Sequence, residues 1–330
     1  MGAAFDLARA RLLLAALRLE RHAPPSEFHA AWLEAVSSIV SGGYVFLLEQ
    51  ERPLAVPLLA AGLNSANPRT AAVTKSLLEH LARVSPPPLH VVTLGRLEIR
   101  QGKRMVEKRA LRKRRAGEVF ALLLLAPSHT LSFEQVTEAL CPERGPRAAQ
   151  SFFHHATSSL RHALEPDLPE KFPSRYLEVE EGWITLRLPS NSWVDFEAFE
   201  SHCRREEWEA ALSLYGGEFL PEFRYADWAI APRERLSLLY QRALLAAARS
   251  RLAAGRLAEA LEACQRLLAL EPWHEEAVFL GMRACVALND LAGACRLYLA
   301  LEKALREDLG IAPHEQLRAF YHSITSSSAP

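Results

Sequence analysis

The sequence predicts a mainly α-helical protein with one small α+β domain, and three observations indicate this fold class. Apolar residues recur at helical spacing through residues 1–85 and again from residue 191 to residue 330. Between these segments, short stretches show the alternation that is typical of β-strands. Pro86, Pro87 and Pro88 separate the first helical segment from the rest of the chain, and proline fixes φ and removes an amide donor. We therefore expect a helical segment over 1–85, a proline linker over 86–88, an α+β domain over 89–190 and a helical domain over 191–330.

The first segment contains three stretches with a helical pattern. Leucines alternate with charged residues over 4–22, and the pattern stops at Pro24 and Pro25. The same spacing continues over 28–40 and 68–84. These stretches predict a small helical domain.

The composition excludes several classes of protein. Lys plus Arg and Asp plus Glu both number 39, and 49% of the residues are hydrophobic, which is typical of an ordinary globular protein rather than a histone-like or disordered one. The apolar run at 119–126 is far shorter than a membrane helix. Charged residues interrupt the N-terminal apolar stretch, whereas a signal peptide requires an uncharged apolar region. Five cysteines without a CxxC pair indicate buried thiols in a reducing compartment. We expect a cytoplasmic protein without a membrane segment.

The middle domain shows the order of elements of a winged helix-turn-helix. Two-residue alternation over 89–106 predicts short antiparallel strands. Helical patterns follow at 113–125, at 133–140 after the cap-like Ser132, and at 146–164. A strand pair at 176–180 and 183–188, joined by a turn that contains Gly182, closes the domain.

A strongly basic stretch lies over residues 96–115. It contains ten basic and two acidic side chains, a local net charge of +8, whereas residues 195–330 carry 15 basic and 20 acidic side chains. A polyanion is one natural partner, because lysine and arginine displace the counterions that phosphates hold. A solvated basic face that aids solubility remains the alternative.

The helix predicted over 146–164 has one apolar and one polar face. Its buried stripe consists of Ala149, Phe153, Ala156, Leu160 and Leu164, at spacings of three and four. The opposite face carries Gln150, Ser151, His154, His155, Ser158 and Arg161, with Arg147 near the start. Such a face fits a major groove and can present polar groups to base edges. A face that is merely hydrated is the other interpretation.

The sequence contains no pattern that predicts an enzyme active site. His154 and His155 point about 100° apart on a helix, and His162 lies roughly 10 Å further along, too far to share one metal ion. The segment from Gly95 to Lys103 has the wrong glycine spacing for a nucleotide-binding loop. No motif of a hydrolase or metalloprotease is present. We expect no catalytic residues, no bound metal and no cofactor.

An internal repeat indicates the architecture of the last domain. Residues 252–260 align with 286–294 at a constant shift of 34 residues, which is the period of the tetratricopeptide repeat. Pro272 lies between successive helix pairs, and Ala260 and Ala294 allow helices to approach closely. An earlier helix pair is predicted over 196–215.

These motifs together support a resemblance to a known family. LGRLEIRQGK, LRKRRAGEVFALLLLAPSHTLSFEQVTEALCPE, SLRHALEPD and YLEVEEGWITLRL resemble the OmpR/PhoB-type winged helix of the SARP class of bacterial activators. WVDFEAFE, YGGEFLPEF, WAIAPRERL and LEKALREDLGIAPHEQL are similar to the bacterial transcriptional activator domain, a tetratricopeptide module. The resemblance covers residues 89–324.

The resemblance implies a cytoplasmic transcription factor. It would bind direct repeats in double-stranded DNA upstream of a promoter, as a homodimer on DNA, and contact RNA polymerase holoenzyme. By position, the residues that would face bases are Arg147, Gln150, Ser151, His154, His155 and Ser158. The residues that would contact phosphates are Lys108, Arg109, Arg112, Lys113, Arg114, Arg115 and Arg161, with the group at 112–115 at the start of the first helix.

Two departures from the family pattern weaken part of this expectation. Ser158 and Ser159 stand where relatives often carry Arg or Lys, and Glu180 and Glu181 replace a basic tip of the wing. Carboxylates repel phosphates, so we expect the basic stretch over 96–115 to provide most of the attraction to DNA.

Two alternatives stay open. In residues 1–85, ARARLLLAALRLE and YVFLLEQERPLAVPLLAAGL resemble the last helical repeats before the DNA-binding domain of MalT-like regulators, which implies a helical segment of the tetratricopeptide type. This segment is either a signal-receiving or dimerising segment, the end of a longer regulator, or a helical spacer. For the whole chain, the alternative function is a tetratricopeptide adaptor whose basic stretch binds an acidic protein partner.

Overall fold

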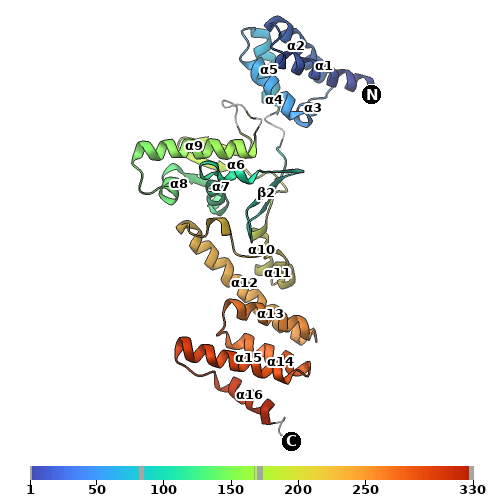
Figure 1. The fold of residues 1–330 in the computed structure, drawn as a ribbon. Helices are drawn as coiled ribbons and strands as arrows, with labels where there is room; N and C mark the ends of the chain where they lie inside the picture. The colour runs from blue at the N-terminus through green and yellow to red at the C-terminus, as the bar shows by residue number, and fades with distance from the viewer. Residues whose placement is uncertain (1, 82–84, 167, 169–173, 327–330) are drawn as a thin grey trace. The chain divides into compact units, whose positions relative to one another are not determined.

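The computed structural model describes residues 2–81, 85–166, 168 and 174–326 (Figure 1). The chain divides into two compact units. The first consists of Met1–His90 and Ile99–Ser192, and the second consists of Val91–Glu98 and Trp193–Pro330. Helices predominate, with short strands in the middle of the chain, which confirms the predicted fold class.

The N-terminal part of the first unit is a cluster of five helices. Its buried core surrounds Trp32, whose indole nitrogen donates a hydrogen bond of 2.9 Å to the hydroxyl of Thr74. Gly62 lies against this pair, and a Cβ atom there would stand 2.4 Å from the Thr74 hydroxyl, so only glycine fits. The helices are α1 (Gly2–Glu20), α2 (Pro25–Ser41), α3 (Phe46–Gln50), α4 (Arg52–Leu63) and α5 (Pro68–Leu81).

All five helices lie in the segment that was predicted to be helical, and three of them correspond to predicted ranges. The expected helices over 4–22, 28–40 and 68–84 correspond to α1, α2 and α5, with residues 82–84 outside the described residues. Helices α3 and α4 lie in the stretch over 44–63 that resembles helical repeats, although their bounds were not predicted. Pro57 lies inside α4 and interrupts the sequence signal, but the buried residues of this helix pack into the shared core and stabilise it despite the lost amide donor.

The rest of the first unit has the winged-helix order of elements. Residues 86–88 have no regular secondary structure, and the hydroxyl of Tyr176 donates a 2.7 Å hydrogen bond to the carbonyl of Pro87. Burial raises the pKa of Tyr176 to about 12, so this donor stays protonated. The elements are β2 (Glu98–Gln101), β3 (Arg104–Met105), α6 (Lys108–Arg112), α7 (Ala116–Leu125), β4 (Thr130–Ser132), α8 (Phe133–Leu140), α9 (Pro146–Leu164), β5 (Leu177–Glu180) and β6 (Trp183–Leu186).

The wing of this domain is a three-stranded antiparallel sheet. The strand order is β4-β6-β5, and Ile184 of β6 pairs with Leu131 of β4 on one side and with Val179 of β5 on the other. Glu181 and Gly182 form the turn with positive φ values of 48° and 85°. The acidic tip predicted from the sequence therefore lies at the end of a tight two-residue hairpin.

The first helix of the winged helix differs from its prediction over 113–125. Helix α6 ends at Arg112, a 3-10 turn covers Lys113–Arg115, and α7 begins at Ala116. Arg114 and Arg115 have φ values of 50° and 61°, in the left-handed region that non-glycine residues rarely adopt. Lys113–Arg115 directly precede α7, and Arg115 is its N-cap. The helix begins at residue 116 rather than 113, because a helical spacing of apolar residues does not reveal the kink between α6 and α7.

The second unit is helical, and its first helix begins at a buried aspartate. The Asp195 carboxylate is 2% exposed and accepts hydrogen bonds of 2.6–2.8 Å from the amides of Thr93, Leu94 and Phe196 and from the Thr93 hydroxyl. It therefore joins the end of β1 (Leu89–Val92) to the start of α10. The helices are α10 (Asp195–Arg204), α11 (Trp208–Leu214), α12 (Asp227–Ala253), α13 (Leu257–Leu270), α14 (Glu275–Ala287), α15 (Leu291–Ala304) and α16 (Glu315–Ser326).

The repeat predicted with a period of 34 residues corresponds to two helix pairs. Helices α12 and α13 form the first pair and α14 and α15 the second, and each helix packs against the next (Figure 1). Gly255 and Asn289, which align in the repeat, both have positive φ values, 75° and 63°, at the turn inside each pair. The earlier pair expected over 196–215 corresponds to α10 and α11.

Over the described ranges, no helix combines the length and the apolar character that crossing a bilayer requires. Four of the cysteines are buried thiols, as expected, whereas Cys295 is only half-buried.

Candidate nucleic-acid interface

Helix α9 is the centre of the candidate interface, and it presents the polar face that the sequence predicts. Pro146 occupies its first turn, where a missing amide donor costs nothing. All five residues of the predicted apolar stripe are buried. The six residues expected to face bases are all exposed, namely Arg147, Gln150, Ser151, His154, His155 and Ser158.

Packing of aromatic rings holds α9 with this face outward. The rings of Phe153 and Phe133 meet edge to face with centroids 5.3 Å apart. The guanidinium of Arg144 lies 5.3 Å from the ring centre of Phe152, which is also buried. Because these contacts fix the rotation of α9, the polar residues on its other side share one orientation.

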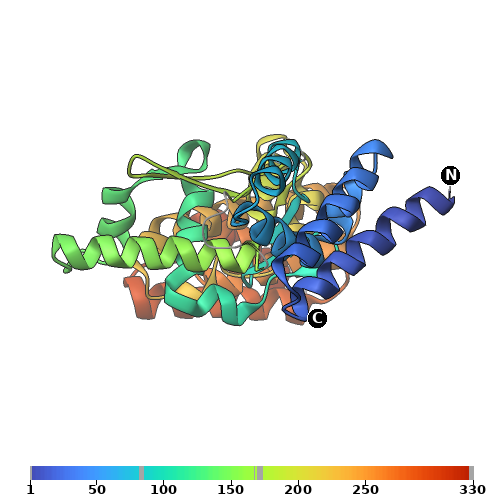
Figure 2. The same cartoon turned by 90° about the horizontal axis from the view of Figure 1, so that it is seen from above.

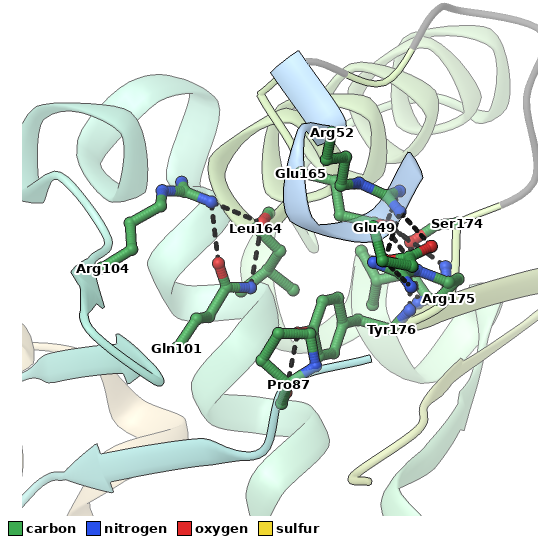
Figure 3. A network of polar contacts seen from close by, with 11 residues as sticks. Glu49, Arg52, Pro87, Gln101, Arg104, Leu164, Glu165, Ser174, Arg175 and Tyr176 are labelled. Carbon is green, nitrogen blue, oxygen red and sulfur yellow. Dashed lines mark hydrogen bonds and ion pairs between the residues drawn. The ribbon is translucent and has the colours of Figure 1, made fainter. Parts of the chain in front are cut away.

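The C-terminal end of α9 is anchored by two side chains from β2 and β3 (Figure 3). Gln101 donates a 2.9 Å hydrogen bond to the carbonyl of Leu164, and Arg104 donates to the carbonyls of Leu164 and Ala163 at 3.0 and 2.8 Å. These carbonyls lack partners within the helix, so a cation there stabilises the end of the helix. In the sequence, Arg104 stands out only as one member of the basic stretch, and no local signal marks Gln101 at all.

Five of the seven expected phosphate contacts are exposed cations beside α9. They are Lys108, Arg109, Arg112, Lys113 and Arg114. Helix α6 and the turn at 113–115, which carry them, both pack directly against α9. Within the described part of the chain, none of these five side chains forms an ion pair or a side-chain hydrogen bond, so their charges are available to a partner.

Arg115 and Arg161, the other two expected phosphate contacts, are less exposed than these five. Arg115 is half-buried and forms a two-fold ion pair with Glu118, with both distances 2.5 Å, and also binds the carbonyl of Leu140. The hydrogen bond to Glu118 raises the pKa of Arg115, although its burial acts in the opposite direction. Arg161 is also half-buried. Arg115 therefore has an internal partner, and its contacts with Glu118 and the carbonyl of Leu140 connect the start of α7 to the end of α8.

A groove of about 460 Å³ separates α9 from the strand β5, which runs alongside the helix (Figure 2). His154, Ser158 and Arg161 line it from α9, and Glu178 and Glu180 line it from β5. The carboxylate of Glu178 forms an ion pair with Arg187, whose side chain also lines the groove. One edge of the polar face of α9 therefore lies opposite a wall that carries Glu178, Glu180 and Arg187, with the charge of Glu178 balanced by Arg187.

Among the described residues, no three His, Cys, Asp or Glu side chains lie close enough together to share a metal ion. His162 points its Nδ1 atom at the carbonyl of Ser158, at 2.8 Å, one turn earlier in the same helix.

Comparisons with known proteins concern the second unit and the fold of the chain. Residues 195–325 match the family model described as "Bacterial transcriptional activator domain". Among solved structures, the chain is similar to Mycobacterium tuberculosis EmbR, which was determined in complex with a low-affinity phosphopeptide, with a TM-score of 0.56 and 21% sequence identity. The match covers 74% of this chain and 66% of the EmbR chain. No curated protein matches the sequence. Residues 195–325 therefore form a bacterial transcriptional activator domain, and the chain shares the fold of EmbR over the matched part.

Proposed function

We propose that the protein is a cytoplasmic, sequence-specific DNA-binding activator that reads the major groove with α9. The observation that carries this proposal is the exposed polar face of α9 directly beside five exposed cations at 108–114. Phosphate contacts fix the position of a protein on the duplex, and side chains in the groove select the sequence. The two sets of residues lie on adjoining elements of one compact unit, as such a division of labour requires.

The roles of the individual residues follow from their chemistry. Gln150 can form two hydrogen bonds with adenine, and Arg147 can do so with guanine. His154, His155, Ser151 and Ser158 supply shorter hydrogen-bonding groups along the same face. Lys108, Arg109, Arg112, Lys113 and Arg114 contact phosphates. We leave Arg115 and Arg161 out of this set because both are half-buried and Arg115 is bound to Glu118.

The activator would bind direct repeats upstream of a promoter, as a homodimer on DNA, and recruit RNA polymerase holoenzyme through the helical domain. Footprinting of bound sites across a bacterial genome tests the first part, and a shift of an upstream fragment with purified protein tests binding itself. Equal affinity for all duplexes would rule out sequence-specific regulation.

A tetratricopeptide adaptor is the second candidate function, and a groove in the second unit favours it. This groove of about 810 Å³ is lined by the stacked rings of Tyr215 and Tyr240, by Arg266, and by the exposed Leu238 and Leu270. Apolar and aromatic surfaces of this kind bind peptide segments. If the purified protein shifts no DNA and instead carries a protein partner in fixed proportion, the adaptor is the better description.

A further inference from the structure

Four charged side chains form a closed square between the N-terminal helices and the winged helix (Figure 3). Glu49 of α3 and Arg52 of α4 stand on one side, and Glu165 at the end of α9 and Arg175 just before β5 stand on the other. Each carboxylate contacts both guanidiniums. Across the interface, Arg52 lies 3.1 Å from Glu165 and Arg175 lies 2.9 Å from Glu49.

The square is largely buried and completely paired. The Glu165 side chain is 3% exposed and Arg175 is 12% exposed. Glu165 also accepts hydrogen bonds from the Ser174 hydroxyl at 2.5 Å and from the Arg175 amide at 3.0 Å. Removing one member would leave the others buried without full compensation, which is far more costly than the net gain of forming the pair.

Each side of the square is electrically neutral by itself. Arg52 is 3.3 Å from Glu49 within the N-terminal helices, and Arg175 is 3.5 Å from Glu165 within the winged helix. If the two sides separate, each keeps its own ion pair and both pairs become hydrated. Separation therefore strands no lone buried charge, unlike the rupture of an ordinary buried ion pair.

A second contact independently joins the same two parts. Leu168, which follows α9, is 6% exposed and belongs to the buried core of the N-terminal helices together with Trp32. This apolar contact supplies the favourable free energy that a buried ion pair does not supply on its own. The charges then determine the position in which the helices dock.

We propose that residues 2–81 are a separable docking module, and that Glu49 and Arg52 are positioning residues for the DNA-reading helix. They act on the two elements that flank the groove at His154 and Ser158, because Glu165 ends α9 and Arg175 leads into β5. Release of the module would free the end of α9 and the start of β5, which meet at one end of that groove. This effect on DNA rests on the proposed function, whereas docking itself does not.

The test compares hydrogen exchange in full-length variants. Arg175→Glu places like charges beside each other and is expected to raise amide exchange in α3 and α4 by about tenfold or more. Adding Glu49→Arg makes both contacts across the interface attractive again, but it also places like charges at positions 49 and 52 and leaves them at 165 and 175. Exchange in α3 and α4 is therefore expected to fall below that of Arg175→Glu without reaching the wild-type rate. Arg187→Glu is the matched control, since Arg187 flanks the same hairpin but pairs with Glu178. It should leave α3 and α4 unchanged.

Unchanged exchange in α3 and α4 on Arg175→Glu, or a double variant no better protected than the single one, would overturn docking. If Arg175→Glu does not fold, Arg52→Gln probes the same interface from the other side, with the same expected direction. Affinity for an operator fragment is measured in parallel and should fall and recover with exchange. Exchange that changes while affinity does not would refute the positioning role, and wild-type protein that binds no DNA would refute the proposed function while exchange still decides docking.

Discussion

The salt dependence of DNA binding follows from the number of exposed cations beside α9. Five side chains, Lys108, Arg109, Arg112, Lys113 and Arg114, are exposed and have no partner among the described residues. If each neutralises one phosphate, the slope of log affinity against log salt is about −4.5, and affinity falls about 500-fold between about 50 and about 200 mM. Lys113→Ala should reduce the magnitude of the slope by about 0.9.

The assay is fluorescence anisotropy of a labelled upstream duplex at four or more salt concentrations. The matched control is Arg115→Gln, two residues away, which removes the same charge from a side chain that is bound to Glu118. It should lower the free energy of unfolding by about 1–3 kcal/mol, because the charged hydrogen bonds from Arg115 to the half-buried Glu118 and to the carbonyl of Leu140 are lost, yet leave the slope unchanged. A slope that falls equally for both variants, or a wild-type slope near zero, would refute the assignment of these five residues.

Three further outcomes are expected. His154→Ala should alter the preferred sequence in a selection from random duplexes while the salt slope stays constant, and an unchanged preference would remove His154 from the reading face. Asp195→Asn should lower the free energy of unfolding in urea by about 2–4 kcal/mol, because an amide nitrogen then faces the buried amide donors of Thr93 and Leu94. The control is Asp227→Asn at an exposed position, which should lower the free energy of unfolding by less than about 0.5 kcal/mol. A thiol reagent at pH 8 should label Cys295 first, because burial raises the pKa of Cys264 to about 12 and so suppresses its thiolate; equal labelling of both thiols in the folded protein would contradict this.

Local signals in the sequence predicted the helices whose ends are determined by their own residues. The helix expected over 133–140 has those bounds, because Ser132 and Gln135 form a reciprocal capping box. The helix over 146–164 also has the predicted bounds, with Pro146 in its first turn. The exposed face of α9 could also be predicted, because the helical period alone decides which side chains are buried together.

Features that depend on distant partners could not be predicted. Arg175 and Glu49 are 126 residues apart, and no local pattern indicates that they meet. Arg115 is indistinguishable in the sequence from its basic neighbours, yet it is the one bound to Glu118 and to the carbonyl of Leu140. A run of like charges indicates a surface, but only the fold shows which of its members are already bound.

The hydrogen bonds of the buried Asp195 carboxylate can form only late in synthesis of the chain. Its partner Thr93 lies 102 residues earlier, with the winged helix between them. At roughly 5–20 residues per second, the ribosome needs about 5 to 20 s to deliver Asp195 after Thr93. During that interval the amides of Thr93 and Leu94 remain hydrated, while α6 to α9 emerge and pack. The hydrogen bonds between Asp195 and Thr93 can therefore form only after α9 has been synthesised.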